Sequence, residues 1–301
     1  MSSLSGAETK LRGGRAGPAI GVMTRLSRRL GKGIIYVFLI TMAFVELMPM
    51  MWLFSTSLRL PKASFDLPPD FFPTSFRWQN YQAVFTSERI NYPLFFLNSL
   101  RIAVVVTVGQ LFTCSMAAFA YARMRFRGNG TIFFLFLASM MIPGTAVVLP
   151  YFIIVKFLGL TDTHWALILP GLTSAFGVFL LRQHFMALPA DLMDAAKIDG
   201  ASFFKIYWSI LLPTVAPGLA SLGIFTFLAS WNEYYAASLF LRSWDKYTLP
   251  LALTLLAGYM GTGSIAEILA SVFLSILPVL AVFLLAQNFV IESMSRSGMK
   301  G

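Results

Sequence analysis

The sequence predicts an all-α membrane protein with six transmembrane helices. Of its 301 residues, 57% are hydrophobic and only 12% are charged, whereas soluble domains carry about 25% charged residues. Six apolar stretches are long enough to cross a bilayer core, which takes about 20 residues of helix. Because backbone groups find no water in that core, each stretch must satisfy its own hydrogen bonds as a helix.

The six predicted spans differ in length and in their prolines. They cover residues 33–56, 96–122, 131–157, 165–186, 208–240 and 265–291. The fifth is longer than a bilayer requires, so its outer end is expected to bend or to be irregular. Prolines lie inside or at the ends of the spans, at Pro49, Pro143, Pro150, Pro170, Pro217 and Pro278. Each removes a backbone hydrogen bond and is able to kink its helix.

The first 32 residues differ in composition from the rest of the chain. Residues 1–32 are basic and contain many small residues, so we expect a poorly ordered cytoplasmic tail. A cleavable signal peptide is the alternative. Against it, the apolar run after Lys32 is too long for a signal core, and no small-x-small cleavage site follows. Residues 33–301 show no Gly/Ser-rich linker and no repeat, which indicates one transmembrane domain.

The placement of positive charge predicts the orientation. The net charge is +10, and 15 of the 23 Lys and Arg residues lie on the inner side if the N-terminus is cytoplasmic. The segment Arg123-Met-Arg-Phe-Arg127, between the second and third spans, is the clearest local signal. Since cytoplasmic loops carry an excess of Lys and Arg, both termini are expected in the cytoplasm. Because the Lys and Arg residues are distributed as membrane topology requires, the net positive charge is no sign of nucleic-acid binding.

The segment 57–95, between the first two spans, is expected to face outward as an ordered lid. Its prolines forbid a continuous helix, and its aromatic side chains favour the headgroup zone of a bilayer. The prolines are Pro61, Pro68, Pro69, Pro73 and Pro93, and the aromatic residues are Phe65, Phe71, Phe72, Phe76, Trp78, Tyr81 and Phe85.

A polar segment, residues 187–213, separates the fourth and fifth spans. Its spacing of acid-Ala-Ala-x3-Gly-x9-Ile-x-Leu-Pro resembles the cytoplasmic coupling loop of permease subunits of ATP-binding-cassette importers, which docks onto the ATPase. The one departure is an aspartate where the family usually has glutamate. The ATPase-coupling residues that the resemblance implies are Asp194, Ala195, Ala196, Gly200, Ile210, Leu212 and Pro213.

The residues of this segment predict two short helices joined by a turn. Pro189 suits the start of a helix, since its missing N–H would have no partner there. Asp191 and Asp194 follow in the first turns, where the helix dipole favours anions. Gly200 supplies a turn because glycine enters left-handed backbone geometry without penalty.

The first of these helices is suited to a groove on a partner. The small side chains of Ala195 and Ala196 would allow close contact, and Met193, Ile198 and Phe203 are candidate apolar anchors. The alternative is an ordinary amphipathic helix-turn-helix at the membrane interface.

Further segments resemble the second permease subunit of carbohydrate importers, the maltose-type inner-membrane component. They are Tyr121-Ala-Arg-Met-Arg-Phe-Arg-Gly128, Met141-Ile-Pro-Gly-Thr145, Trp165-Ala-Leu-Ile-Leu-Pro170, Phe179-Leu-Leu-Arg-Gln-His-Phe185 and Trp231-Asn-Glu-Tyr234. The resemblance covers about residues 35–301. It implies the type I importer permease fold, a bacterial inner-membrane location and transport by alternating access.

The same resemblance implies three kinds of partner. These are a homologous second permease that forms a heterodimer with this chain, two ATPase subunits and an extracytoplasmic solute-binding protein. The chain has no G-x4-G-K-[ST] phosphate loop. ATP and Mg²⁺ are therefore expected in the partner ATPases, and this chain is expected to hold no cofactor and to be no enzyme.

Candidate substrate contacts come from the general chemistry of sugar binding. Sugars need aromatic faces and neutral hydrogen-bonding groups more than charges. The pore candidates are Gln110, Trp231, Asn232, Glu233 and Tyr234. Ionisable residues within spans are functional candidates by default, but Asn and Glu also join helices by hydrogen bonds. For Asn232 and Glu233 both interpretations stay open, and the partner permease is a second place for the contacts.

Other side chains favour structural roles. His164 and His184 lie near opposite ends of the fourth span without a carboxylate cluster, so no metal site is expected. Cys114, the only cysteine, excludes an intrachain disulfide.

Two other classes of membrane protein are the rivals. An ion-coupled secondary transporter would use intramembrane acids such as Glu46 and Glu233, but it leaves the 194–213 pattern unexplained. An intramembrane enzyme would need a matched nucleophile and base at bilayer depth, and we find no such set. Within the importer class, glycerol-phosphate, polyol and amino-sugar solutes are alternatives, and the sequence does not name the sugar.

Overall fold

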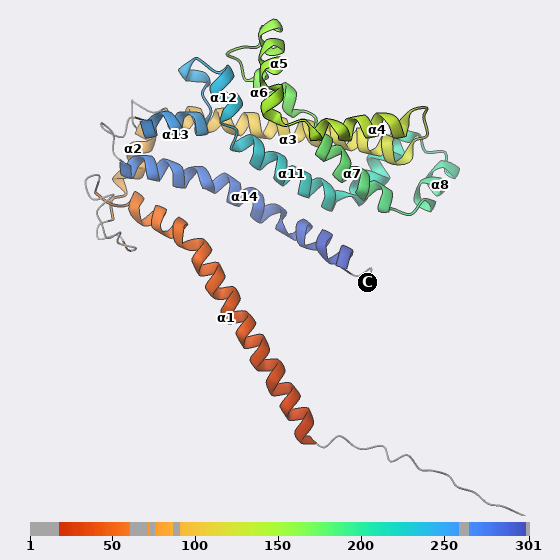
Figure 1. The fold of residues 1–301 in the computed structure, drawn as a ribbon, viewed down its shortest axis with the longest axis horizontal. Helices are drawn as coiled ribbons and strands as arrows, with labels where there is room; N and C mark the ends of the chain where they lie inside the picture. The colour runs from red at the N-terminus through yellow and green to blue at the C-terminus, as the bar shows by residue number, and fades with distance from the viewer. Residues whose placement is uncertain (1–17, 61–71, 73–75, 87–90, 259–264, 299–301) are drawn as a thin grey trace, which may run out of the picture. The chain divides into compact units, whose positions relative to one another are not determined.

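Every regular element in the described part of the chain is a helix. The computed structural model describes residues 18–60, 72, 76–86, 91–258 and 265–298, and no strand lies within these ranges (Figure 1). The all-α prediction is therefore confirmed. The chain divides into two compact units, residues 1–52 and 53–301, and each is described by itself.

Residues 18–52 of helix α1 (Pro18–Ser57) are the described part of the first unit, and the last turn of the helix belongs to the second. The helix begins well before residue 33, so part of the predicted tail is helical; residues 1–17 lie outside the described ranges. Its segment Gly31–Ser57 is long and apolar enough to cross a membrane. Apolar side chains such as Ile34, Phe38 and Phe44 are more than half exposed. A helix that is apolar all round needs lipid or another protein as cover.

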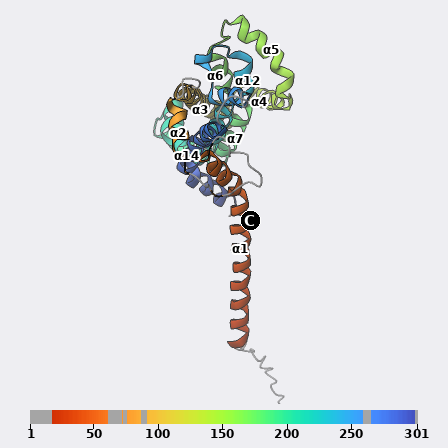
Figure 2. The ribbon, with the colours of Figure 1, turned by 90° about the vertical axis from the view of Figure 1, so that its left-hand side faces the viewer.

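Four helices form the core of the second unit. They are α3 (Tyr92–Arg123), α7 (Ala175–Ala187), α11 (Ala216–Trp231) and α14 (Ile265–Gly298). Helix α3 packs against α7 and α11, and α11 packs against α14 (Figures 1 and 2). Small residues allow the closest approaches: a Cβ on Gly218 would lie 2.6 Å from the His184 ring, and one on Gly177 would lie 3.0 Å from Cys114 Sγ.

In the part of the chain that the structure describes, four of the six predicted spans are long and apolar enough by themselves, and the count reaches six if each of two bent helix pairs is one span. The first such pair occupies the predicted third span, and its two helices meet at a sharp bend. Helix α4 (Asn129–Ala138) and the 3-10 turn η2 (Ser139–Met141) are followed by α5 (Gly144–Phe157), at 103° to the first part. The bend lies at Ile142 and Pro143, which both have extended backbone. Proline cannot continue a helix and disfavours helical geometry in the residue before it. A simple proline kink within one span over 131–157 would be smaller than this bend.

The fifth span is also bent, by 78° at the start of α11. It is preceded by α9 (Phe203–Lys205), the π-helix η3 (Ile206–Leu211) and α10 (Leu212–Thr214). Helix α11 ends at Trp231, and α12 (Tyr235–Phe240) follows after a break. The irregularity predicted for the far end of the span over 208–240 is therefore confirmed. In the fourth span, α6 (Trp165–Gly171) is followed by α7, with a short break between the two helices.

Three short elements lie where no span is predicted. They are α2 (Gln79–Thr86), the 3-10 turn η4 (Trp244–Lys246) and α13 (Leu249–Gly258). The side-chain amide of Asn80 ties α2 to the end of α1, donating to Ser57 O at 2.8 Å and to Arg59 O at 2.9 Å. The predicted lid is thus held in place at these residues, while 61–71, 73–75 and 87–90 lie outside the described ranges.

Candidate functional site

The first helix of the 187–213 segment forms as the sequence predicts. Helix α8 (Asp191–Ile198) carries both Asp191 and Asp194 in its first turn, where the positive end of the helix dipole stabilises them. The predicted start at Pro189 is two residues early, because Pro189 precedes the helix and Ala190 caps it.

Gly200 makes the predicted left-handed turn after α8, with φ 76°. Its N–H donates to Lys197 O at 3.0 Å, and the next N–H, of Ala201, donates to Ala196 O at 2.9 Å. This pair of bonds is a Schellman motif, which satisfies the last carbonyl groups of the helix and fixes the direction of the chain after it.

The second half of the segment continues into α11. The Ser202 hydroxyl accepts a hydrogen bond from Lys205 N at 3.3 Å and so caps α9. In the π-helix η3, the Tyr207 hydroxyl is 2.8 Å from Ser115 Oγ of α3, and this pair is buried. The later motif residues lie beyond it: Ile210 and Leu212 pack against the core, and Pro213 lies in the first turn of α10.

Arg123, at the end of α3, holds the base of the segment. Its guanidinium donates to Phe185 O at 2.6 Å and to Leu188 O at 2.5 Å. Both carbonyl groups lie at the C-terminus of α7, where Phe185 O also accepts the N–H of the cap residue Leu188 at 3.3 Å. Arg123, which sequence reasoning used as a topology signal and as part of a family segment, therefore joins α3 to the start of the 187–213 segment.

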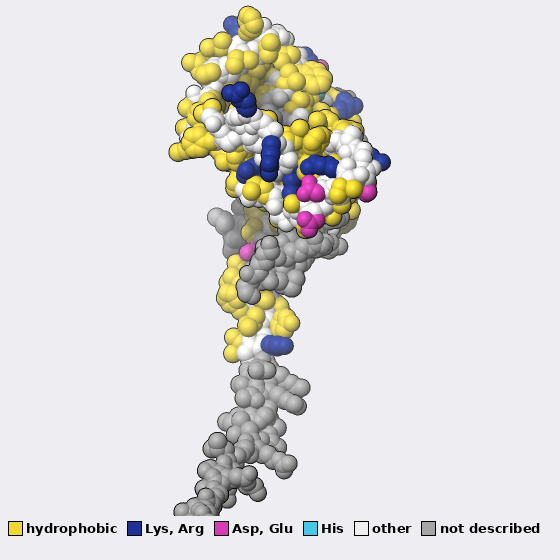
Figure 3. Space-filling model, turned by 90° about the vertical axis from the view of Figure 1, so that its right-hand side faces the viewer, with side chains coloured by type: hydrophobic (Ala, Val, Ile, Leu, Met, Phe, Trp, Pro, Cys, Tyr) yellow, Lys and Arg dark blue, Asp and Glu magenta, His cyan; other side chains and the backbone are white. Residues whose placement is uncertain are grey.

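Helix α8 has one face against its own chain and one face exposed. Met193 and Ala196 are 6% and 5% exposed, so Met193 is covered within this chain. Ala195, Asp194 and Ile198 are exposed, Ile198 to 87%. Figure 3 views this end of the molecule, where acidic and basic side chains gather around apolar ones. The exposed face of α8 is thus a small apolar strip bordered by charge.

A hollow of about 880 Å³ lies beside α8. Arg123 and Arg125 line it from the α3–α4 turn, and Asp194, Lys197 and Phe203 line it from the 187–213 segment. Asp194 and Lys197 form an exposed ion pair at 3.2 Å, which adds little stability in water. Phe203, a predicted anchor, is half exposed at this hollow.

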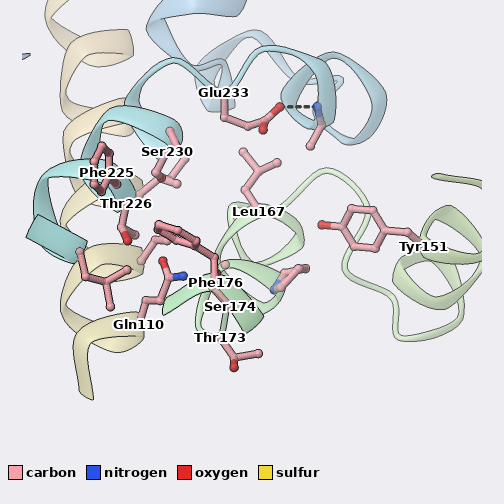
Figure 4. Close-up of a pocket in the computed structure, with 17 residues that line it drawn as sticks. Gln110, Tyr151, Leu167, Thr173, Ser174, Phe176, Phe225, Thr226, Ser230 and Glu233 are labelled. Carbon is pink, nitrogen blue, oxygen red and sulfur yellow. Dashed lines mark hydrogen bonds between the residues drawn. The ribbon is translucent and has the colours of Figure 1, made fainter. Parts of the chain in front are cut away.

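A second cavity, of about 470 Å³, lies among the helices of the second unit (Figure 4). Its lining comes from α3, α5, α6, α7, α11 and α12, and we call it the intramembrane pocket. The polar residues in the lining are Gln110, Tyr151, Thr173, Ser174, Thr226, Ser230 and Glu233, and the phenylalanines are Phe176 and Phe225. Its size is typical of small-molecule sites.

The five pore candidates separate into two groups. Gln110 and Glu233 line the intramembrane pocket, and a Glu233 carboxylate oxygen accepts a hydrogen bond from Ala236 N at 2.7 Å. The other three do not line it. Trp231 is buried and donates to Ser275 O at 3.1 Å, Asn232 donates to the carbonyl oxygen four residues earlier at 2.9 Å, and Tyr234 is exposed.

Sequence reasoning missed several residues of the pocket, among them Tyr151, Phe176, Phe225 and Thr226. A signal for one of them was present. Residues 222, 226, 229 and 233 recur at helical spacing and line one face of the fifth span. Their spacing alone does not say whether that face meets a cavity, lipid or another helix.

Asp162, also missed, joins two loops at the opposite end of the helices from α8. Its carboxylate accepts hydrogen bonds from Arg242 N and Ser243 N, both at 2.9 Å, from Ser243 Oγ at 2.5 Å and from Lys246 Nζ at 3.0 Å. These bonds, led by that of the Ser243 hydroxyl, hold the pKa of Asp162 well below its usual range. His164 lies beside it, with Nε2 3.0 Å from Lys246 O.

Comparisons with known proteins agree with this architecture. The family model described as "Binding-protein-dependent transport system inner membrane component" matches residues 109–294. The arabinooligosaccharides transport system permease protein AraQ of Halalkalibacterium halodurans is 36% identical over 232 residues, which cover 77% of this chain and 82% of that protein. The lactose transport system permease protein LacG of Rhizobium radiobacter is 30% identical over 281 residues, 91% and 98% of the two chains.

A solved structure shares the fold. It is a chain of a bacterial ABC transporter involved in the import of the acidic polysaccharide alginate. The TM-score is 0.76 at 25% sequence identity, and the match covers 88% of this chain and 98% of that one.

Proposed function

The chain belongs to the family of binding-protein-dependent transport system inner membrane components, and on that basis we propose that it is the permease subunit of an ATP-driven importer of carbohydrate. It is a multi-pass inner-membrane transport permease rather than an enzyme. Relatives named for arabinooligosaccharides and lactose, and the structural relative that imports alginate, support carbohydrate as the transported class.

In this proposal the exposed face of α8 docks onto an ATPase subunit. Ala195 brings the helix close to a partner surface because its side chain is short, and Ile198 supplies an apolar contact. The turn at Gly200 and the bonds of Arg123 keep the helix in a fixed orientation. The end of the molecule that carries α8 is then cytoplasmic, with both termini on that side.

The proposed partners complete the transport cycle. Two ATPase subunits hold ATP and Mg²⁺, a homologous second permease forms the other half of the pore, and an extracytoplasmic protein delivers the solute. ATP-driven closure of the ATPases moves α8, and the movement reaches the intramembrane pocket through α9, η3 and α10, which continue into α11. Helix α11 carries Thr226 and Ser230 of the pocket.

The observation that carries the proposal is the exposed and firmly held α8 with the residue spacing of a coupling loop. A cross-linking experiment tests it. Ala195→Cys, labelled with a maleimide–benzophenone reagent in the assembled complex, is expected to form an adduct with the co-expressed ATPase subunit. The native Cys114 is fully buried and does not compete for the reagent.

Leu158→Cys is the matched control, because Leu158 is 56% exposed in the loop at the opposite end of the helices. It is expected to give no adduct with the ATPase. Equal adducts from both positions, or none from position 195 in an intact complex, would contradict docking through α8.

A further inference from the structure

Two polar side chains that line the intramembrane pocket are available to a ligand. Gln110 and Thr226 are 8% and 6% exposed, and within the described part of the chain no hydrogen bond is formed by either side chain. Thr107, Thr214 and Thr254, which also lie in helices, each donate instead to the carbonyl oxygen four residues earlier. The polar atoms of Gln110 and Thr226 are not among the fully buried ones that lack a partner, so they are open to the pocket and available to a ligand there.

The surroundings of these two groups fit a saccharide. Figure 4 shows Gln110 and Thr226 on the same side of the pocket as the rings of Phe176 and Phe225. These rings meet edge to face with centroids 6.2 Å apart, and both are substantially exposed. An amide and a hydroxyl are able to bond sugar hydroxyls, while aromatic rings cover the apolar C–H faces of a sugar.

The charge of the pocket narrows the class of solute. Among the described residues that line it, none is Lys, Arg or His, and Glu233 is the one carboxylate. A uronate or a sugar phosphate would therefore enter a largely apolar space without a cation to pair with, which is costly. A neutral sugar loses only hydrogen bonds to water, and the pocket replaces these.

We propose that this chain contributes its own solute subsite to the pore, built on Gln110 and Thr226, and that the subsite takes a neutral saccharide unit and disfavours uronates and sugar phosphates. The inference rests on the proposed function, because it assumes that a carbohydrate passes through the pocket. Beyond the proposed function, the inference states that this permease itself contacts the solute.

The first arm of the test measures class selectivity. The complete complex with its binding protein, in proteoliposomes, is offered radiolabelled maltose, lactose, arabinotriose, an alginate trisaccharide and glycerol 3-phosphate. ATP-dependent uptake of at least one neutral sugar is expected, at about tenfold or more above both anions. Uptake of an anion at a comparable rate would overturn the neutral class. If no probe is taken up or stimulates ATP hydrolysis, the proposed carbohydrate function fails, and this inference fails with it.

The second arm tests the subsite itself. For the neutral sugar that is transported, Gln110→Leu and Thr226→Val are expected to lower the number of sugars moved per ATP hydrolysed by about tenfold, as expected for lost hydrogen bonds in a buried site. Hydrolysis stimulated by the loaded binding protein is expected to stay within about twofold. The matched controls are Gln287→Leu and Thr254→Val, whose side chains bond their own helices outside the pocket.

Two outcomes overturn the subsite without touching the proposed function. One is an unchanged ratio of sugar to ATP in both pocket variants. The other is a parallel loss of uptake and ATP hydrolysis in both variants, which would assign the two residues a structural role.

Discussion

The two ends of the helices in the second unit are stabilised in different ways. At the end with α8, the turn at Gly200 depends on bonds between residues at most five positions apart, and Arg123 secures the base. At the other end, Asp162 bonds residues 80 to 84 positions later. There Asn98 also donates to Asp245 O at 2.9 Å and to Tyr247 O at 3.0 Å.

This difference matches two different mechanical roles. Local bonds make α8 and its turn a rigid element with one face free for a partner, and the distant bonds of Arg123 lie at its base. Bonds between distant segments instead join the α5–α6 loop to the loop after α12, so that these two loops move together or not at all. The first end suits a moving contact, and the second suits a fixed support for the outer part of the pocket.

The strongest test of the comparison uses two left-handed glycines, one at each end. Gly200 and Gly159 have φ of 76° and 67°, and a Cβ on either would meet no atom within 4 Å. Gly200→Val and Gly159→Val therefore introduce a similar backbone strain of about 1–2 kcal/mol. We expect Gly200→Val to abolish ATP-driven uptake, because the chain after α8 changes direction.

Gly159→Val is expected to keep uptake within about threefold of the unaltered protein. Membrane levels of both variants, measured by immunoblot, should be similar. If both variants lose uptake equally, the special role of the turn at Gly200 is wrong.

A smaller effect is expected from the base of the segment. Arg123→Gln removes two charge-assisted hydrogen bonds, to Phe185 O and Leu188 O, each worth about 1.5–3 kcal/mol. Uptake should fall about tenfold and the unfolding temperature of the purified complex should fall by several degrees. Arg125→Gln is the control, since Arg125 is exposed and lines the same hollow. Equal effects of the two changes would indicate that charge alone matters there.

The 187–213 segment was predictable because its determinants are local. Acids in the first turn and a glycine with positive φ specify a helix and its end without knowledge of the rest of the fold. The same holds for the four apolar spans whose length and composition suffice, while 131–157 and 208–240 are spans only if each bent helix pair counts as one. The partial burial of α8 was not predictable: whether Met193 meets its own chain or a partner depends on where α3 and α4 lie.

Other features were also missed because they depend on where distant helices pack and not on the local sequence. Pro143 was recognised as a breaker, but the 103° bend of the third span is a property of its surroundings as well as of one residue. Thr226 lies at helical spacing with Glu233, yet only packing shows that this face of α11 borders a cavity. Asp162 lies in a loop, and its partners are contributed by a segment 80 residues away.

The smallest expected effect concerns Asp162 and pH. Because its hydrogen bonds lower the folded-state pKa below the unfolded value of about 3.9, the carboxylate stabilises the folded protein at every pH above that value. This contribution is lost as the pH falls through about 4 toward the folded-state pKa. Asp162→Asn should therefore lower the unfolding temperature by a constant amount between pH 7 and 5, and the difference should shrink between pH 4 and 3.

Asn tolerates the left-handed backbone of residue 162, where φ is 59°, so the substitution tests the charge and not the strain. Asp245→Asn, in the exposed part of the loop that Asp162 binds, is the control and should change the unfolding temperature little at any pH. A difference for Asp162→Asn that stays constant down to pH 3 would mean that the carboxylate contributes through its shape alone. The second end would then be held by Asn98 and His164, and the contrast with the α8 end would rest on them.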